Sequence, residues 1–192
     1  LGSGLAGLHY CLQLLEKKPN ARIALVSKAQ ATESNSRYAQ GGIAAAVSQD
    51  DAITAHIRDT ILAGDALCYP KAVDAIIKKG ASAIEQLNHY DIPFKKQPDG
   101  HYLFGQEGGH SKRRIIHCGD QTGLNVINAL ISKARTQSNI HFFEDHIAVN
   151  LITHYHPHDV DNQGEVLGAY VLDCHNKKIH TFLSHAVVLA TG

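Results

Sequence analysis

The sequence predicts an α/β fold with a parallel sheet and helices, and with a smaller β-meander toward the C-terminal end. A glycine-rich turn, Gly2–Gly7, opens the chain. A helix over 5–17 with apolar residues at helical spacing follows the turn, and a short apolar strand over 22–27 follows the helix. Strand, turn and helix in this order are typical of a sheet whose helices connect parallel strands.

The last third of the chain predicts the meander. Its segments alternate apolar and polar residues, as half-buried strands do. We expect strands over 140–144, 148–154, 168–174 and 179–183, and a final buried strand over 186–190.

The middle of the chain predicts helices joined by one long loop. Isoleucines spaced by four residues predict a helix over 53–61, Pro70 begins a second helix that Gly80 stops, and a third covers 81–89. A loop over 92–109 follows, and long loops in compact domains are usually functional. A helix over 122–135 comes next, with Thr122 or Asp120 as its cap.

Composition excludes several classes of protein. The 192 residues carry 18 basic and 18 acidic side chains, which gives no electrostatic reason to bind nucleic acid or an anionic membrane. No apolar stretch approaches the roughly 20 residues that span a bilayer. The four scattered cysteines predict reduced thiols in a cytoplasmic protein.

The opening turn has the spacing Gly2-x-Gly4-x-x-Gly7. In a Rossmann-like domain the first glycine permits the tight turn, the second lets a pyrophosphate approach the backbone, and the third lets the helix pack closely. The pattern therefore predicts dinucleotide binding, with a tight turn that binds nothing as the alternative. An acid for the ribose is missing, because the second strand ends in Val26-Ser27-Lys28; a hydroxyl or ammonium could take its place.

A second motif indicates which dinucleotide binds. Residues 35–44, Asn-Ser-Arg-Tyr-Ala-Gln-Gly-Gly-Ile-Ala, resemble the flavin-contacting loop of the succinate dehydrogenase and fumarate reductase flavoprotein family. The resemblance implies FAD, with Gly41 and Gly42 leaving room for the isoalloxazine against the backbone; a glycine-rich surface loop is the alternative. Dehydrogenases of the family attach FAD to a histidine at the position of Asn35, so the resemblance implies non-covalent FAD here.

A third motif points to one branch of that family. Glu107-Gly-Gly-His-Ser111, with Arg113, Arg114, His117 and the following residues to Gly123, resembles the L-aspartate oxidases. The resemblance implies hydride transfer from Cα of L-aspartate to FAD N5, giving iminoaspartate, and reoxidation of the flavin by oxygen or fumarate. It also implies a place in NAD biosynthesis through quinolinate, with hand-over of the product to quinolinate synthase.

Glu107 is the predicted substrate-orienting residue, because a carboxylate can pair with the ammonium of L-aspartate. A solvated loop acid is the alternative. Arg113 and Arg114 could bind substrate carboxylates, but adjacent arginines more often make surface or interdomain contacts. For His110 and His117 we expect packing and hydrogen bonding near the flavin.

The same resemblance implies a set of cofactor-binding residues drawn from the glycine turn, the end of the second strand, the flavin-contacting loop, one meander strand and the C-terminal segment. They are Gly2, Ser3, Gly4, Leu5, Ala6, Gly7, Lys28, Asn35, Ser36, Arg37, Tyr38, Ala39, Gln40, Gly41, Gly42, Ile147, Ala148, Ala190, Thr191 and Gly192.

Other interpretations of these motifs remain. A fumarate reductase or succinate dehydrogenase flavoprotein, or a flavin-binding module without turnover, would share most of these features. His154, His156 and His158 superficially suggest a metal motif, but no distant ligand set accompanies them and we expect no metal. Only Leu1 precedes the glycine turn, so we expect residues 1–192 to form one incomplete FAD-binding domain that lacks its first strand and the family's capping and C-terminal helical domains.

Overall fold

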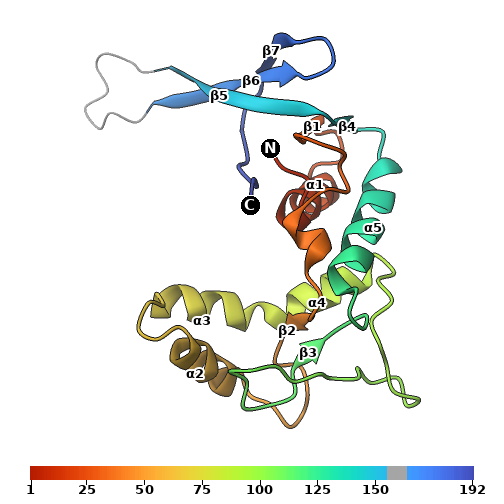
Figure 1. Ribbon diagram of the computed structural model, residues 1–192, viewed down its shortest axis with the longest axis vertical. Helices are drawn as coiled ribbons and strands as arrows, with labels where there is room; N and C mark the ends of the chain where they lie inside the picture. Colours follow the sequence, from red (N-terminus) through yellow and green to blue (C-terminus); the bar gives the residue numbers. More distant parts are fainter. Residues whose placement is uncertain (155–163) are drawn as a thin grey trace. The chain divides into compact units, whose positions relative to one another are not determined.

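The computed structural model describes residues 1–154 and 164–192, which form two compact units (Figure 1). The first unit comprises residues 1–37 and 130–192, and the second comprises residues 38–129. Helices, parallel strands and antiparallel strands are all present, so the predicted α/β class is confirmed. None of the helices within the described ranges is long and apolar enough to cross a membrane.

The parallel sheet of the first unit begins at the glycine turn. Strand β1 (Ile23–Val26) pairs in parallel with β4 (Ile140–Phe143), with Ile23 opposite Ile140. The nitrogen of Gly2 donates to the carbonyl of Val26 at 2.9 Å, so the turn extends this sheet on the other side of β1. Helix α1 (Leu5–Lys17) follows and buries its apolar stripe, as its spacing predicts.

The expected final strand over 186–190 is wrong as a strand: the structure shows it as irregular backbone. Two hydrogen bonds of parallel type remain, from the Leu1 nitrogen to the Val188 carbonyl at 2.7 Å and from the Ala190 nitrogen to the Leu1 carbonyl at 2.8 Å. These two bonds are too few for the ladder of successive pairs that defines a strand.

The meander is confirmed as a three-stranded antiparallel sheet in the order β5–β6–β7 (Figure 1). Its strands are β5 (His146–His154), β6 (Glu165–Asp173) and β7 (Lys178–Leu183), and the first two begin earlier than the sequence predicts. One face packs on the parallel sheet through Ala169, Val171 and Val26. Phe143 and Phe182 meet edge to face there, with ring centroids 4.8 Å apart.

The second unit contains three of the predicted helices. They are α2 (Ile53–Ala63), α3 (Pro70–Lys78) and α4 (Gly80–Asn88), and α2 and α3 lie side by side (Figure 1). Two antiparallel strands were not predicted, β2 (Ile43–Ala44) and β3 (Ile115–Ile116). Each is two residues long, too short to show a periodic pattern in the sequence.

Helix α5 (Thr122–Arg135) confirms the last predicted helix and runs from the second unit into the first. Thr122 is its first residue, but the Thr122 hydroxyl bonds the residues before the helix: it accepts from the nitrogen of Cys118 at 3.0 Å and donates to the carbonyl of Gly119 at 3.4 Å. Thr122 therefore fixes the turn that leads into α5. A 3-10 turn, η1 (Asn35–Tyr38), was also not predicted.

Candidate functional site

The glycine turn is packed so tightly that two of its positions exclude a side chain. A Cβ on Gly2, whose φ is +106°, would lie 2.0 Å from the Ala190 carbonyl oxygen. A Cβ on Gly7 would lie 2.0 Å from the carbonyl oxygen of Gly2. The first glycine therefore permits the turn and the third permits close packing of α1, which are the roles that their spacing predicts.

The middle glycine lies at the N-terminus of α1 beneath a serine. Gly4 is the N-cap of α1 and makes no side-chain cap of its own. Instead, Ser36 Oγ accepts a hydrogen bond from the Leu5 nitrogen at 3.2 Å, and a Cβ on Gly4 would lie 3.3 Å from the same oxygen. The helix N-terminus carries partial positive charge, and the small residues around it leave the backbone open to an anion.

The C-terminal residues lie beside these two segments. A Cβ on Gly192, whose φ is +83°, would lie 3.7 Å from Asn35 Nδ2, and Ala190 contacts Gly2 and Gly7. The structure thus brings together residues 2–7, 35–37 and 190–192, which belong to three predicted cofactor-binding segments that are far apart in the sequence.

Lys28, Ile147 and Ala148 lie near one another at the end of β1. The nitrogen of His146, the first residue of β5, donates to the Ser27 carbonyl at 2.9 Å. All three predicted residues are exposed. The Ser27 hydroxyl, by contrast, is buried and donates to the Ala29 carbonyl at 2.8 Å, so it is not a free donor for a ribose.

In the second unit, the flavin-contacting loop and the Glu107 motif meet. A Cβ on Gly41 would lie 2.0 Å from Glu107 Oε1 and 2.9 Å from its Cδ. The carboxylate therefore lies directly on the backbone of Gly41, and only glycine leaves it that place. Gly42, with φ +146°, also packs closely on β3, since its Cβ would lie 2.6 Å from Ile115 Cγ2. Tyr38, Ala39 and Gln40 of the same loop are exposed.

Arg114 lies in a buried ion-pair network that the sequence did not reveal. Its side chain is 0% exposed; Nε and Nη2 bind the two oxygens of Asp51 at 2.7 and 2.8 Å, and Nη1 binds Asp59 Oδ2 at 2.6 Å. The predicted roles for Arg114, a substrate ligand or a surface contact, are therefore wrong, because the guanidinium is buried and bound to the two carboxylates. Neither aspartate stands in a sequence pattern that marks it.

The same network sets the ionisation of its members. Hydrogen bonds from the Ser111 nitrogen and hydroxyl, with Arg114, hold the pKa of Asp59 well below its usual range. Burial and the charge of Arg114 lower the pKa of His56, whose ring centroid lies 5.7 Å from that of His110. Arg114 Nη1 approaches His110 Nδ1 at 3.3 Å; because arginine only donates, Nδ1 is the acceptor and the proton of neutral His110 sits on Nε2.

The remaining predicted residues lie elsewhere in the second unit. Arg113 is exposed and lines an open hollow of about 850 Å³ with Lys96, His101 and Lys112, and Glu107 is not among its lining residues. His117 Nδ1 accepts from the Gly119 nitrogen at 3.1 Å, which makes it a turn-stabilising residue. His154 ends β5, whereas His156 and His158 lie outside the described residues.

Comparisons with known proteins support an FAD-binding domain, as the glycine turn at residues 2–7 and the pair Gly41 and Gly42 indicate. The family model described as an FAD binding domain matches residues 1–192. The L-aspartate oxidase of Acinetobacter baylyi is 38% identical over 192 residues, and L-aspartate oxidase 1 of Ralstonia nicotianae is 39% identical over 195. Each match covers 100% of this chain but only 35% and 36% of the relative, so the chain spans about a third of these proteins.

Solved structures point to the same fold. The quinol fumarate reductase of E. coli matches with a TM-score of 0.90 and 28% identity, over 100% of this chain and 31% of that chain. A quinol-fumarate reductase solved with menaquinol matches with a TM-score of 0.84 and 27% identity, over 95% of this chain and 30% of that chain. The chain therefore belongs to the FAD-binding domain family, and its cofactor is FAD.

Proposed function

We propose that the protein that carries this chain oxidises L-aspartate to iminoaspartate, with residues 1–192 as one incomplete FAD-binding domain. The observation that carries the proposal is the contact between the Glu107 carboxylate and the backbone of Gly41. Gly41 belongs to the loop that resembles the flavin-contacting loop of the family, so the contact puts a negative charge beside the expected place of the ring. The matched L-aspartate oxidases support this choice of substrate.

The residues present fit FAD. Gly2 and Gly7 have no space for a side chain, and Gly4 keeps the N-terminus of α1 open, as a pyrophosphate would require. Gly41 and Gly42 are exposed and carry no side chain, so a flat ring can approach their backbone from the side that Glu107 and Ile115 do not occupy. Asn35, which cannot form a covalent bond to the flavin as a histidine can, supports non-covalent binding. When bound, FAD would supply the acceptor for the hydride that leaves the substrate Cα, while the α-ammonium releases one proton to solvent so that the nitrogen lone pair can form the C=N bond.

Glu107 would bind and orient the amino acid. Its side chain is exposed, so it can reach a substrate, and its carboxylate can pair with an α-ammonium by a charge-assisted hydrogen bond. Fixing the ammonium fixes the direction of the Cα–H bond, which is how a binding group contributes to the rate. Succinate carries no ammonium and would be repelled by the same carboxylate, so Glu107 favours L-aspartate over succinate.

The proposal extends to the partners of the whole protein. Oxygen or fumarate would accept the electrons, and the product would pass toward quinolinate and NAD through quinolinate synthase. A fumarate reductase is the second candidate, and the TM-score of 0.90 with the quinol fumarate reductase of E. coli favours it. Asn35 and Glu107 favour the oxidase.

The test is a peroxide assay of the full-length protein with L-aspartate, D-aspartate and succinate, repeated for Glu107→Gln. Loss of a charged hydrogen-bond partner is worth about 1.5–3 kcal/mol, so kcat/KM for L-aspartate should fall roughly 10- to 100-fold. Glu85→Gln, at an exposed acid on α4, is the matched control and should leave kcat/KM unchanged. An unchanged L-aspartate KM in Glu107→Gln, or turnover of succinate instead, would refute the proposal.

Covalent attachment of the flavin can be measured separately. Acid precipitation of the full-length protein should release the yellow flavin into the supernatant. Flavin that remains in the pellet would contradict the expected role of Asn35 and would favour the dehydrogenase alternative.

A further inference from the structure

Glu107 belongs to a loop, residues 106–114, that is closed at its base by two backbone hydrogen bonds. The Gly105 nitrogen donates to the Ile115 carbonyl at 2.8 Å, and the Ile115 nitrogen donates to the Gly105 carbonyl at 3.1 Å. We call residues 106–114 the Glu107 loop. It contains adjacent glycines, and a Cβ on Gly108 would meet nothing within 4 Å. Such a segment is conformationally free unless other contacts hold it.

Asp59 of α2 makes those contacts. Its Oδ2 accepts three hydrogen bonds: from the Ser111 nitrogen at 2.8 Å, from Ser111 Oγ at 2.7 Å and from Arg114 Nη1 at 2.6 Å. The side chain of Asp59 is only 9% exposed, so water competes weakly for this oxygen. One carboxylate of a helix thereby holds two points of the Glu107 loop.

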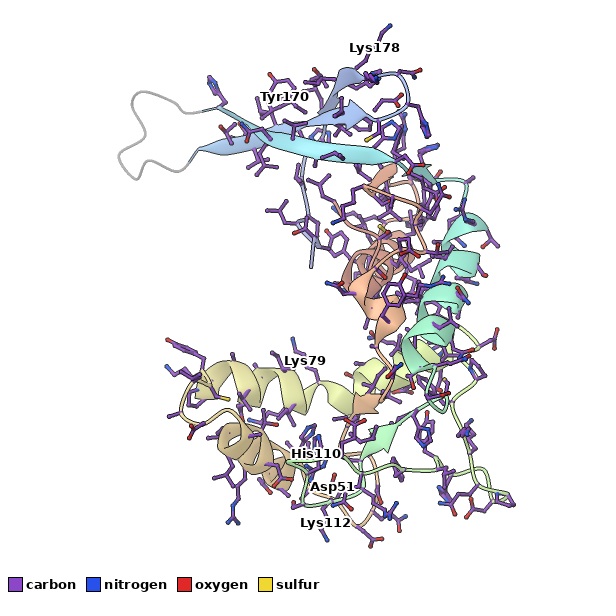
Figure 2. The ribbon with its side chains drawn as sticks, viewed as in Figure 1. Asp51, Lys79, His110, Lys112, Tyr170 and Lys178 are labelled. Atoms are coloured by element: carbon purple, nitrogen blue, oxygen red, sulfur yellow. The ribbon has the colours of Figure 1, made fainter. Side chains whose placement is uncertain are left out.

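The hold on Ser111 extends to Glu107 through a short turn. The His110 nitrogen donates to the Glu107 carbonyl at 3.3 Å, and Gln106 Nε2 donates to the His110 carbonyl at 2.9 Å. His110 is also held by Arg114, and Figure 2 shows Asp51 and His110, which contact the same guanidinium. The backbone of Glu107 is thus tied, within four residues, to Asp59.

We propose that Asp59 and Ser111 are positioning residues that hold the Glu107 carboxylate against Gly41 and so determine selectivity for an amino dicarboxylate over a dicarboxylate without nitrogen. The inference rests on the proposed function, because it assigns a purpose to the place of Glu107. A freely moving Glu107 loop would present the carboxylate in many positions, and the ammonium would lose its fixed partner. A substrate such as fumarate, which has no ammonium, would lose nothing.

The test uses three variants of the full-length, FAD-loaded protein. Ser111→Ala removes the hydroxyl bond but keeps the backbone bond and the Arg114–Asp59 ion pair, so the fold should survive. Ser111→Thr restores a hydroxyl and should return the KM for L-aspartate and the rate of hydrogen exchange toward the wild-type values. Asp51→Asn is the control. Within the Glu107 loop, Asp51 binds the side chain of Arg114 and makes no hydrogen bond to Ser111 or to the backbone of the loop.

For Ser111→Ala we expect the KM for L-aspartate to rise about 3- to 10-fold, with the KM for fumarate unchanged or lower and the FAD content unchanged. Amide hydrogen exchange at residues 106–110 should accelerate in this variant and return toward the wild-type rate in Ser111→Thr. Asp51→Asn should lower Tm yet keep the ratio of the two KM values.

Two results would overturn the proposal. One is a parallel rise of both KM values, which would indicate general damage. The other is an unchanged KM for L-aspartate with accelerated exchange, which would mean that the anchor holds the loop but not the substrate. Failure of the proposed function looks different: Glu107→Gln then leaves the L-aspartate KM unchanged, whatever hydrogen exchange shows for Ser111→Ala.

Discussion

Replacing Gly7 with alanine would test the packing of the glycine turn. The added Cβ would lie 2.0 Å from the Gly2 carbonyl oxygen and 3.1 Å from its carbonyl carbon. Both atoms are backbone, so α1 or the turn must move by more than about 1 Å to restore ordinary contact. Overpacking of this kind costs about 1–3 kcal/mol. A chain of this size loses about 2–4 °C of Tm per kcal/mol, so Tm should fall by roughly 2–12 °C.

The matched control is Gly4→Ala, because both changes add one methyl group to the same turn. Its Cβ would lie 3.3 Å from Ser36 Oγ, the end of a side chain that can rotate, and the φ of Gly4 is −72°. We expect Tm without FAD to change by less than about 1 °C, while FAD binding weakens because the methyl group occupies the approach to the helix N-terminus. The assays are thermal unfolding of the apoprotein and FAD titration by fluorescence quenching. Equal Tm values for the two variants would refute the steric argument.

Three further predictions concern buried groups. Arg114→Met leaves two carboxylates facing each other without a cation, so the free energy of unfolding in urea should fall by about 3–5 kcal/mol, and a loss below about 1 kcal/mol would contradict the network. The pKa of His56 is lowered in the folded protein, so as the pH drops below about 6.5 the unfolded chain binds a proton at His56 before the folded chain does, and Tm should fall. The lowered pKa of Asp59 should add a further loss of Tm only below about pH 4. His56→Phe should reduce the dependence of Tm on pH near 6.5 and leave the part below pH 4. Burial raises the pKa of Cys11 to about 11, so iodoacetamide at pH 8 should modify Cys11 only after the protein unfolds. Mass spectrometry measures the labelling. Rapid labelling of the native protein would show that α1 is not packed as described.

The features that the sequence predicted correctly depend on interactions between residues that are close together in the chain. The spacing of Gly2, Gly4 and Gly7 and the apolar stripe of α1 depend on neighbours within a turn or two, and the structure agrees with them. The meander followed from alternation within each strand. Its strand limits did not, because pairing with a neighbour extends β5 and β6 beyond their alternating segments.

Contacts between distant segments could not be predicted in the same way. The strand over 186–190 was predicted from its apolar residues alone, but a strand needs a ladder of successive pairs, and the structure shows two hydrogen bonds between this segment and Leu1. Arg114 looked like a surface residue because adjacent arginines usually are. Its partner Asp51 lies just before α2 and its partner Asp59 lies in the middle of α2, where acids are ordinary.

The sequence by itself predicted an α/β dinucleotide-binding fold, because the glycine positions and the periodicity of its elements are properties of short stretches of chain, and the resemblance of residues 35–44 to a flavin-contacting loop indicated FAD. It also singled out Glu107. Only the tertiary structure decided that the Glu107 carboxylate rests on Gly41, and that Asp59 and Ser111 hold the loop that carries it. The physical reason is distance along the chain: which carboxylate meets which donor depends on how separate segments pack, and one sequence carries no pattern for that pairing.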